Sequence, residues 1–322
     1  MSSITFFTSV EDQLRFVEQR IREQAGEDQH PDLRSALEHL LSAGGKRIRP
    51  TLGLLVGNML GAPEEKLIML GASVELLHTA TLVHDDLIDG ALLRRGLPTL
   101  NARWSPAATV LTGDFLFARA AKLAAQTDYL PLMTLFAETL AVIVNGELTQ
   151  LFSARGMAER DNYYQRIYAK TASLFEMAAL AAAMIATEDE ETRGAMKVFG
   201  YEVGMAFQIV DDILDFTGDP AMVGKPIGSD LLHGLVTLPA IYYAEANPKH
   251  PDVLSLSLGG WKDPDRVQRL VEDIRRSLAI QQAMEEAQQA VDRALKSLSD
   301  APISPEREAL ENLAKFIVDR KI

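Results

Sequence analysis

Apolar residues recur at spacings of three and four along nearly the whole chain of 322 residues, and few stretches alternate with a period of two. This spacing predicts helices with one buried face, and the frequent Leu, Ala, Met and Glu favour the same structure. Because the connections are short, neighbouring helices are expected to run antiparallel. We therefore predict an all-α fold of ten or more mostly antiparallel helices, over residues 10–24, 31–43, 50–60, 64–88, 105–125, 130–153, 159–186, 190–217, 235–245, 264–275, 278–299 and 304–319.

Short signals mark several of these helix starts. Ser105-Pro106 and Ser304-Pro305 each place a hydroxyl before a proline, and Pro63 precedes two glutamates. Serine caps a helix N-terminus, and proline fits the first helical turn. No composition shift, low-complexity linker or tandem repeat divides the chain, so we expect one domain over residues 1–322.

Composition excludes several classes of function. The chain has no Cys, which excludes disulfides, thiolate metal sites and cysteine nucleophiles. Its net charge of −13 counts against nucleic acid as a partner. The first residues lack the basic and long apolar regions of a signal peptide, and no stretch reads as about 20 uncharged apolar residues. We therefore expect a cytoplasmic protein with no integral membrane segment.

The motif D-D-x-x-D occurs twice, in LVHDDLIDG at residues 82–90 and in IVDDILDFTGD at residues 209–219. A helical residue turns about 100°, so the first and last Asp of each motif lie about 40° apart, with the middle Asp inside an arc of about 100°. Each motif thus predicts a row of carboxylates, which Asp219 would extend if its helix continued. The two rows consist of Asp85, Asp86, Asp89, Asp211, Asp212 and Asp215.

Carboxylates this close repel one another and are costly to bury, so something positive must neutralise them. Oxygen ligands suit Mg²⁺, which keeps several waters, binds through one or two carboxylates and bridges to phosphates. A single motif of this kind would favour a solvated helix face. Two copies, each set among apolar residues such as Leu82 and Ile209, favour a site for Mg²⁺ and a diphosphate.

Other polar residues share these helix faces. His78 lies two turns before Asp85 at nearly the same azimuth, and Gln208 lies about 60° from Asp211. A lone histidine on an apolar helix is usually a satisfied core residue, and we interpret His84 in that way. His78 is the better candidate for the site, because its face carries the aspartates.

Basic residues gather in GGKRIRP at residues 44–50 and in LLRRGLP at residues 92–98. In the first group, paired glycines allow close backbone approach beside Lys46, Arg47 and Arg49. Lysine offers a point charge and arginine a planar fork, and both suit diphosphate oxygens. Taken alone, the same residues would also fit an ordinary basic helix cap.

Taken in order, the motifs resemble those of the trans-polyprenyl diphosphate synthases, from about residue 40 to residue 240, and the ending FIVDR is similar too. Any one fragment is weak evidence, but the ordered set is highly specific. The matching fragments are GGKRIRP, VELLHTATLVHDDLIDGALLRRGLPT, GDFLFARA, NGELTQL, KTASLF, FQIVDDILDFTGD and GKPIGSDLLHGLVTLP.

The resemblance implies an isoprenoid synthase fold around a central cavity, a homodimer, and condensation of isopentenyl diphosphate with an allylic diphosphate. Ionisation of the allylic substrate needs no covalent nucleophile on the enzyme. About three Mg²⁺ ions would bridge the allylic diphosphate. Their ligands would be Asp85, Asp86, Asp89, Asp211 and Asp215, with Asp212 also counted as catalytic.

The resemblance also implies roles for basic and polar residues. Arg94, Lys170 and Lys225 would contact the allylic diphosphate, with Thr171 and Gln208 nearby. The diphosphate of isopentenyl diphosphate would be held by Lys46, Arg49, His78 and Arg95.

One position departs from the family pattern. Many members have lysine after the glycine of the G-K-x-T-L-P segment, where this chain has Leu235. Loss of that cation would weaken binding of the allylic diphosphate, and some subunits of two-component long-chain synthases also lack it. Catalytic competence remains the favoured reading, because the other cations and both aspartate motifs are intact.

Product length is expected to depend on residues preceding the first motif. Ala80 lies about 7.5 Å below Asp85 along the helix, Thr81 lies one turn below it and Leu77 two. In the family, a bulky aromatic residue at the position of Ala80 or Thr81 blocks a growing chain. Small residues there, which are also common in ordinary helix packing, favour a product longer than C15, with C30–C50 preferred and C20 as the shorter alternative.

Three rival functions remain open at this stage. The first is a partner-dependent or non-catalytic subunit of a two-component synthase, suggested by Leu235. The second is a terpene cyclase with similar metal chemistry, against which GGKRIRP and His78 count. The third is a structural helical protein with solvated aspartates, which would show no diphosphate-dependent Mg²⁺ binding.

Overall fold

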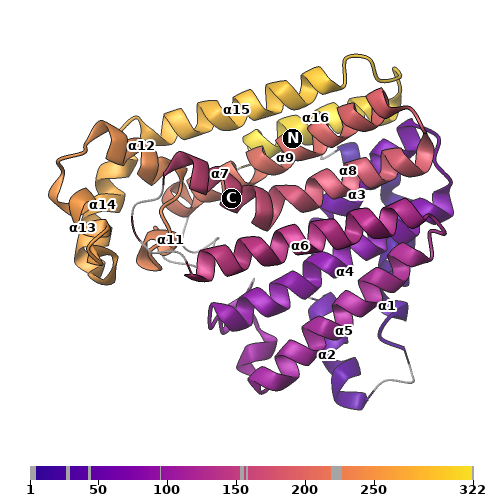
Figure 1. Cartoon of the computed structure of the whole chain (residues 1–322), viewed down its shortest axis with the longest axis horizontal. Helices are drawn as coiled ribbons and strands as arrows, with labels where there is room; N and C mark the ends of the chain where they lie inside the picture. Colours follow the sequence, from indigo (N-terminus) through magenta and orange to yellow (C-terminus); the bar gives the residue numbers. More distant parts are fainter. Residues whose placement is uncertain are drawn as a thin grey trace. The chain divides into compact units, whose positions relative to one another are not determined.

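The computed structural model describes residues 5–26, 30–42, 45–94, 96–152, 156, 159–218 and 227–320, and it confirms the all-α prediction (Figure 1). Each stretch predicted as helical contains a helix. The longer helices are α1 (Glu11–Glu23), α2 (Pro31–Ser42), α3 (Ile48–Met59), α4 (Glu64–Ile88), α5 (Pro106–Ala125), α6 (Leu130–Phe152), α7 (Arg160–Ile167), α8 (Ser173–Ala186), α9 (Glu190–Thr217), α12 (Leu238–Ala246), α14 (Pro264–Arg276), α15 (Ala279–Ser297) and α16 (Pro305–Asp319).

Two of the predicted caps form as expected. Ser105 accepts a hydrogen bond from the backbone N–H of Ala108, and Ser304 accepts one from Arg307. By contrast, α3 begins at Ile48, two residues before the proline predicted to restart it. Pro50 is tolerated there because a backbone N–H in the first turn has no helical partner in any case.

Several short elements were not predicted. They are the 3₁₀ turns η1 (Thr5–Val10), η2 (Leu100–Ala102) and η4 (Gly260–Lys262), the π-helical turn η3 (Tyr168–Ala172), the helices α11 (Ser229–Leu232) and α13 (Pro251–Leu256), and the strands β1 (Leu93–Arg94) and β2 (Leu97–Pro98). The strands pair antiparallel as a small hairpin directly after the first aspartate motif. The π turn interrupts the stretch predicted as one helix over residues 159–186.

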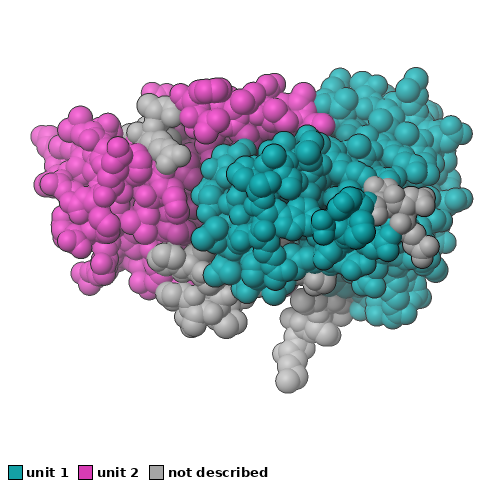
Figure 2. All heavy atoms as spheres, turned by 90° about the horizontal axis from the view of Figure 1, so that it is seen from below, with its two compact units in different colours: residues 1–139, 174–200, 298–312 teal, residues 140–173, 201–297, 313–322 magenta. Residues whose placement is uncertain are grey.

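The chain forms two compact units, coloured separately in Figure 2. Unit 1 comprises Met1–Thr139, Leu174–Gly200 and Leu298–Asn312, and unit 2 comprises Leu140–Ser173, Tyr201–Ser297 and Leu313–Ile322. Because the chain passes from one unit to the other within α6, α9 and α16, the units are not successive domains along the sequence. The single-domain prediction stays a prediction.

Helix α4 is the centre of unit 1 and packs against α1, α3 and α5. Its residues are buried on nearly every side, which is typical of a core helix. Ser73 donates a hydrogen bond to the carbonyl of Ala120, and His84 lies against Gly113, where any Cβ would meet the imidazole at 2.2 Å. These two contacts show that α4 and α5 run antiparallel, and that Gly113 allows their close approach.

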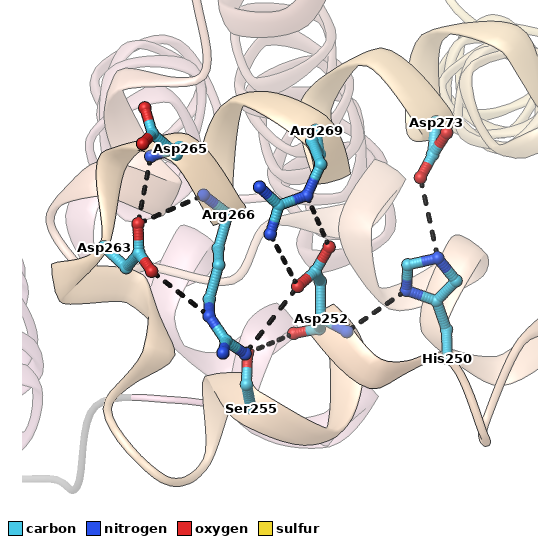
Figure 3. Close-up of polar contacts among 8 residues, drawn as sticks. All are labelled: His250, Asp252, Ser255, Asp263, Asp265, Arg266, Arg269 and Asp273. Carbon is cyan, nitrogen blue, oxygen red and sulfur yellow. Dashed lines mark hydrogen bonds and ion pairs between the residues drawn. The ribbon is translucent and has the colours of Figure 1, made fainter.

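In unit 2, a network of charges joins α13 to α14 (Figure 3). The carboxylate of Asp252, 8% exposed, accepts hydrogen bonds from Arg269 and lies 3.8 Å from Arg266. Asp263 caps the start of α14, and His250 lies 3.6 Å from Asp273. None of the predicted site residues belongs to this network, whose charges are paired with one another, so we interpret it as structural.

Three segments are long and apolar enough, by length and composition alone, to cross a membrane: Glu64–Ile88, Leu130–Phe152 and Arg160–Ala186. The expectation that no such stretch exists was therefore wrong by that measure. In the first and third, 67% and 72% of the most apolar window is buried inside the protein, so their apolar character serves the core. In α6 only 22% of that window is buried.

Candidate functional site

The first aspartate motif lies at the end of α4, in unit 1. Asp85 is half-buried, Asp86 is 6% exposed, and Asp89 is exposed at the cap position that ends the helix. The three carboxylates therefore differ in their access to solvent, although the sequence spacing puts them on one arc. Asp85 and Asp89 are the two that solvent reaches most easily.

Asp86 is held by the hairpin that follows the motif. Arg94 in β1 places its Nε 2.8 Å and its Nη2 2.7 Å from the same carboxylate oxygen, Oδ1. Hydrogen bonds between charged groups are about twice as strong as neutral ones, and burial of Asp86 reinforces the pair. In this structure the predicted diphosphate ligand Arg94 is thus bound to a predicted metal ligand.

The turn carrying GGKRIRP is fixed by Arg47, to which the sequence assigned no role. Arg47 has a left-handed backbone conformation, φ 48°, which is costly for a residue with a Cβ. Its guanidinium is largely buried, and Nη1 lies 2.5 Å from Oε1 of Glu75, itself 6% exposed on α4. This ion pair ties the turn to the helix one turn before His78.

The residues predicted to hold isopentenyl diphosphate are placed around that turn. Lys46 is exposed, and Arg49 is half-buried with its guanidinium 4.6 Å from the ring centre of Phe175. His78 is half-buried and lines a small pocket in unit 1. Side chains of both signs surround this pocket, among them His39, Arg47, Glu75, Asp86 and Arg94.

The second motif lies in the last two turns of α9, in unit 2, and each carboxylate has its own protein partner. Asp211, with a side chain 40% exposed, lies 2.9 Å from the guanidinium of Arg320. Asp215 accepts hydrogen bonds from the backbone N–H and hydroxyl of Ser229 and from the N–H of Asp230. The predicted metal ligand Asp215 therefore caps the short helix α11 in this structure.

Asp212 is the centre of a buried hydrogen-bond network. Tyr163 donates to its Oδ2 at 2.8 Å and Gln208 donates to its Oδ1 at 2.8 Å. Thr171 in turn donates to the amide oxygen of Gln208 at 2.6 Å. The structure thus joins three predicted site residues, Thr171, Gln208 and Asp212, and adds Tyr163, which the sequence analysis missed.

Burial raises the pKa of Asp212 to about 8, and the negative charge of Asp230 adds to the shift. The hydrogen bonds from Gln208 and Tyr163 and the charge of Arg166 act in the opposite direction. Burial, together with this carboxylate, also raises the pKa of Tyr163 well above its ordinary value. Asp212 is therefore the least suited of the three to bind a metal ion as an exposed anion.

Lys170 and Thr171 lie in the π turn η3. π turns are rare and occur frequently at functional sites. The ammonium of Lys170 lies 2.8 Å from Oε1 of Glu147 in α6. The adjacent Gly146 makes this possible, because a Cβ there would meet the Cβ of Ala169 at 2.4 Å. The predicted diphosphate ligand Lys170 is therefore also paired with a carboxylate.

The segment around Leu235 has its own cation. Arg166 in α7 donates a hydrogen bond to the carbonyl of Val236 at 2.8 Å, and its guanidinium lies 5.5 Å from the ring centre of Tyr163. Beside it the hydroxyl of Thr237, 4% exposed, has no hydrogen-bond partner among the residues that the structure describes. The sequence position next to Leu235 is thus held by an arginine from a distant helix.

The predicted chain-length residues lie on two stripes of α4. Leu77 and Ala80 are fully buried, and they fall on the stripe between the Ser73 and His84 contacts with α5. Thr81 is half-buried and projects about 100° away from Ala80. The Nε2 atom of His84 is hydrogen-bonded to the carbonyl of Val110 at 3.1 Å, as expected for a histidine that packs between helices.

Three predicted positions, Arg95, Lys225 and Asp219, lie outside the described residues. Among the residues that the structure does describe, no three His, Asp or Glu side chains form a ready-made metal cage. Tyr163, Arg166, Glu75 and Arg320 could not be recognised from the sequence, because their partners are distant along the chain.

The chain is similar to known proteins over most of its length. Residues 30–274 match the family model described as polyprenyl synthetase. The chain is 40% identical over 291 residues to an all-trans-nonaprenyl-diphosphate synthase of Rhodobacter capsulatus, covering 89% of this chain and 88% of the relative. It is 34% identical over 316 residues to heptaprenyl diphosphate synthase component 2 of Bacillus subtilis, covering 98% and 90%.

A solved structure gives the same result for the fold. The polyprenyl synthase of Caulobacter crescentus, in complex with calcium and isoprenyl diphosphate, has a TM-score of 0.93 and 34% identity, and the match covers 99% of this chain and 98% of that one. The isoprenoid synthase fold inferred from the motifs is confirmed. The chain belongs to the polyprenyl synthetase family and is a trans-prenyltransferase.

Proposed function

We propose that the two aspartate motifs of this prenyltransferase bind an allylic diphosphate through Mg²⁺, and that about three ions take part. The observation that carries the proposal is that each motif keeps at least one carboxylate within reach of solvent, although its neighbours are buried or paired. Asp85, Asp89 and Asp211 are the direct ligands. Asp86 and Asp215 support them, and reach a metal only if they exchange their present partners, Arg94 and α11.

The donor set fits a hard divalent cation, because all of these ligands are carboxylate oxygens. When bound, Mg²⁺ stabilises the negative charge that develops on the departing diphosphate. The Caulobacter relative was crystallised with calcium, another oxygen-seeking divalent ion, and with isoprenyl diphosphate. That relative supports a metal–diphosphate site of the same kind in this chain.

The protein's own cations complete the allylic site. Arg94 and Lys170 are bound to Asp86 and Glu147 in this structure, so each is already oriented and each carries a charge that a diphosphate can share. Lys225 is the third cation of the set. The side-chain amide of Gln208 accepts a hydrogen bond from Thr171 and donates one to Asp212. These two bonds fix the orientation of the amide beside the motif.

Isopentenyl diphosphate binds to the cations beside α4. Lys46, Arg49 and Arg95 neutralise its diphosphate, and His78 donates a hydrogen bond to it. Held in this way, the isopentenyl double bond attacks the allylic carbocation that is left when the C–O bond to the diphosphate breaks, and the condensed product then gives a proton to the released diphosphate. Proximity supplies much of the acceleration, because it replaces an encounter of two molecules by a step within one complex.

The product is an all-trans polyprenyl diphosphate longer than C15, with C30–C50 favoured over C20. The names of the heptaprenyl and nonaprenyl relatives support this range. The small side chains of Ala80 and Thr81 leave the wall of α4 without a bulky stop. Leu77 continues the same wall two turns from the motif.

Substitution at this wall tests the product length. Ala80→Tyr should shorten the product, because an aromatic ring on the stripe facing α5 occupies space along the helix. Thr81→Tyr is the matched comparison on the neighbouring stripe. An unchanged distribution of product lengths in Ala80→Tyr would show that the residue at position 80 does not limit product length.

A homodimer is the proposed assembly, with α6 in the contact between copies. Val144, Leu148, Leu151 and Phe152 form an exposed apolar row on this helix, and Phe152 is 81% exposed. Symmetric pairs of one surface are the commonest protein oligomers, and such a pair would cover the row. Light scattering should give a dimer for the wild type and a monomer for Leu148→Glu.

We place the protein in the cytoplasm. Two of its three apolar segments bury most of their length inside the protein, and the third is the proposed dimer surface. Fractionation of cells should therefore find the chain with the soluble proteins.

The alternative is a partner-dependent subunit, as the name of the Bacillus subtilis relative, component 2, suggests. Purified chain incubated with Mg²⁺, farnesyl diphosphate and labelled isopentenyl diphosphate separates the two. Elongation by the chain alone, with products in the C30–C50 range, supports a self-sufficient synthase. Elongation that begins only when a second subunit is added supports the alternative.

A further inference from the structure

Arg320 follows α16, and its guanidinium is held by an ion pair, a backbone hydrogen bond and a ring contact. The side chain is 7% exposed, and Nη1 lies 2.9 Å from Oδ1 of Asp211. Nη2 donates to the carbonyl of Phe207 at 2.9 Å, and the guanidinium carbon lies 4.0 Å from the centre of the Phe207 ring. A surface ion pair would not fix an arginine in this way, because such pairs are mobile and screened by water.

The group that Arg320 contacts is the leading carboxylate of the second motif. Its two companions are committed elsewhere: Asp212 to the buried network and Asp215 to the cap of α11. The side chain of Asp211 is 40% exposed, whereas Asp212 is 3% exposed. Arg320 therefore acts on the carboxylate of this motif that is best placed to meet a cation from solvent.

We propose that Arg320 is a positioning residue for the second metal-binding motif, a role that rests on the proposed Mg²⁺–diphosphate site. By binding one oxygen of Asp211, it fixes the direction of the carboxylate and neutralises part of the motif's charge. Carboxylates that ligate metals are themselves commonly hydrogen-bonded, and loss of such a partner typically costs 10–100-fold in metal affinity.

A second possible role for Arg320 predicts the opposite change in metal affinity when the arginine is removed. A cation this close to Asp211 could instead compete with the metal, and its removal would then tighten metal binding. Arg320 could also be purely structural and only hold the end of α16 in place. Its removal would then lower the melting temperature of the protein and leave metal affinity unchanged. The three roles are therefore separated by one binding measurement and one melting curve.

The experiment measures Mg²⁺ binding by calorimetry in the presence of methylenediphosphonate, a diphosphate that cannot be cleaved, so that no turnover is involved. Arg320→Gln removes the charge and the fork, whereas Arg320→Lys keeps the charge and loses the fork. Lys315→Gln is the matched control, because it removes a charge from an exposed residue of the same helix. Melting curves in chelator confirm that each variant is folded.

Arg320→Gln is expected to weaken Mg²⁺ binding about 10–100-fold, Arg320→Lys less than Arg320→Gln, and Lys315→Gln not at all. Binding by Arg320→Gln as tight as that of the wild type, or tighter, would overturn the inference. If Arg320→Gln does not fold, unaltered binding by Arg320→Lys would overturn it equally. If the wild type itself shows no diphosphate-dependent binding, the proposed site fails and this inference with it.

Discussion

The two aspartate motifs have the same spacing but different support. The first is held by its own neighbourhood: Arg94, which binds Asp86, lies eight residues along the chain in the adjoining hairpin. The second is held by three other segments, through Tyr163, Ser229 and Arg320, and by its helical neighbour Gln208. Spacing in the sequence decides which carboxylates share a face, and the partners decide which of them remain accessible.

This difference in support predicts that the carboxylates of the two motifs differ in how easily they rearrange. In the first motif Asp85 is half-buried and Asp89 is exposed at a helix end, so we expect Asp89 to rearrange with little disturbance of the fold. In the second, rearrangement would disturb a buried network and a helix cap. We infer that the first motif adapts to the substrate, whereas the second is formed in advance.

The largest expected effect distinguishes two carboxylates of the second motif. Asp211→Asn should lower kcat/KM about 100–1000-fold, the usual cost of losing a group on which charge stabilisation in the transition state depends, because it removes a proposed ligand of the metal that stabilises the departing diphosphate. Asp215→Asn should cost less than about 10-fold, because its side-chain oxygen can still accept the hydrogen bonds from Ser229, and only the bond from the N–H of Asp230 is lost. Steady-state kinetics on both variants measures the contrast, and equal losses would show that Asp215 is a direct ligand.

The next effect concerns the buried network. Tyr163→Phe removes a donor from Asp212 and should lower the free energy of unfolding by about 1–3 kcal/mol, the cost of a buried group left unsatisfied. Tyr164→Phe is the matched control, since Tyr164 bonds a carboxylate, Glu286, outside the motif. Chemical denaturation measures stability, and kcat/KM should fall only in Tyr163→Phe. A loss of activity in both variants would contradict the special role of the network.

A third effect is the pH dependence of the metal-free protein. The pKa of Asp212 is raised from 3.8 to about 8, so the fold favours the neutral carboxyl. Its stabilising contribution is complete below pH 4 and is lost as the pH rises through 8, because the unfolded chain releases that proton first. The loss should exceed about 1.4 kcal/mol, the equivalent of one pKa unit.

Melting curves in chelator between pH 4 and pH 9 measure this contribution. Asp212→Asn keeps the shape of the side chain and cannot titrate, so its profile should be flatter than that of the wild type. Asp89→Asn, at an exposed position of the other motif, is the control. Parallel profiles for wild type and Asp212→Asn would rule out Asp212 as the source.

The smallest effect concerns the turn that supports the isopentenyl site. Arg47→Gly removes the ion pair with Glu75 but relieves the left-handed backbone, whereas Arg47→Ala removes the pair and keeps the strain. Arg47→Ala should therefore be less stable than Arg47→Gly by about 1 kcal/mol. Both should raise the KM for isopentenyl diphosphate more than the KM for the allylic substrate. Equal KM changes would show that the turn does not serve one substrate alone.

Much of the fold could be predicted from periodicity, and the reason is local. Helix spacing, the Ser105 and Ser304 caps and the two motif faces depend on residues within a few positions of one another. The π turn was missed because the phase shift of about 100° that it causes in the apolar spacing is hidden where the following helix, α8, is apolar and buried on most sides. The small helices α11 and α13 are too short to show a period.

The residues of the site were predicted from resemblance to a family and stay a prediction, whereas the bonds between them were not predicted. The structure pairs Lys170 with Glu147, Arg94 with Asp86 and Asp211 with Arg320. These pairs join positions from eight to more than a hundred residues apart, and no local pattern indicates them. Each cation neutralises part of the charge of the carboxylate that it contacts.

The π turn between α7 and α8 has a consequence for the helix that contains it. One additional residue in a single turn rotates everything before it by about 100° relative to everything after it. Tyr163 and Arg166 on one side are therefore aligned independently of the Ala-rich packing face on the other. Deleting Ala169 from this turn would preserve every side chain of the network and rotate Tyr163 away from Asp212.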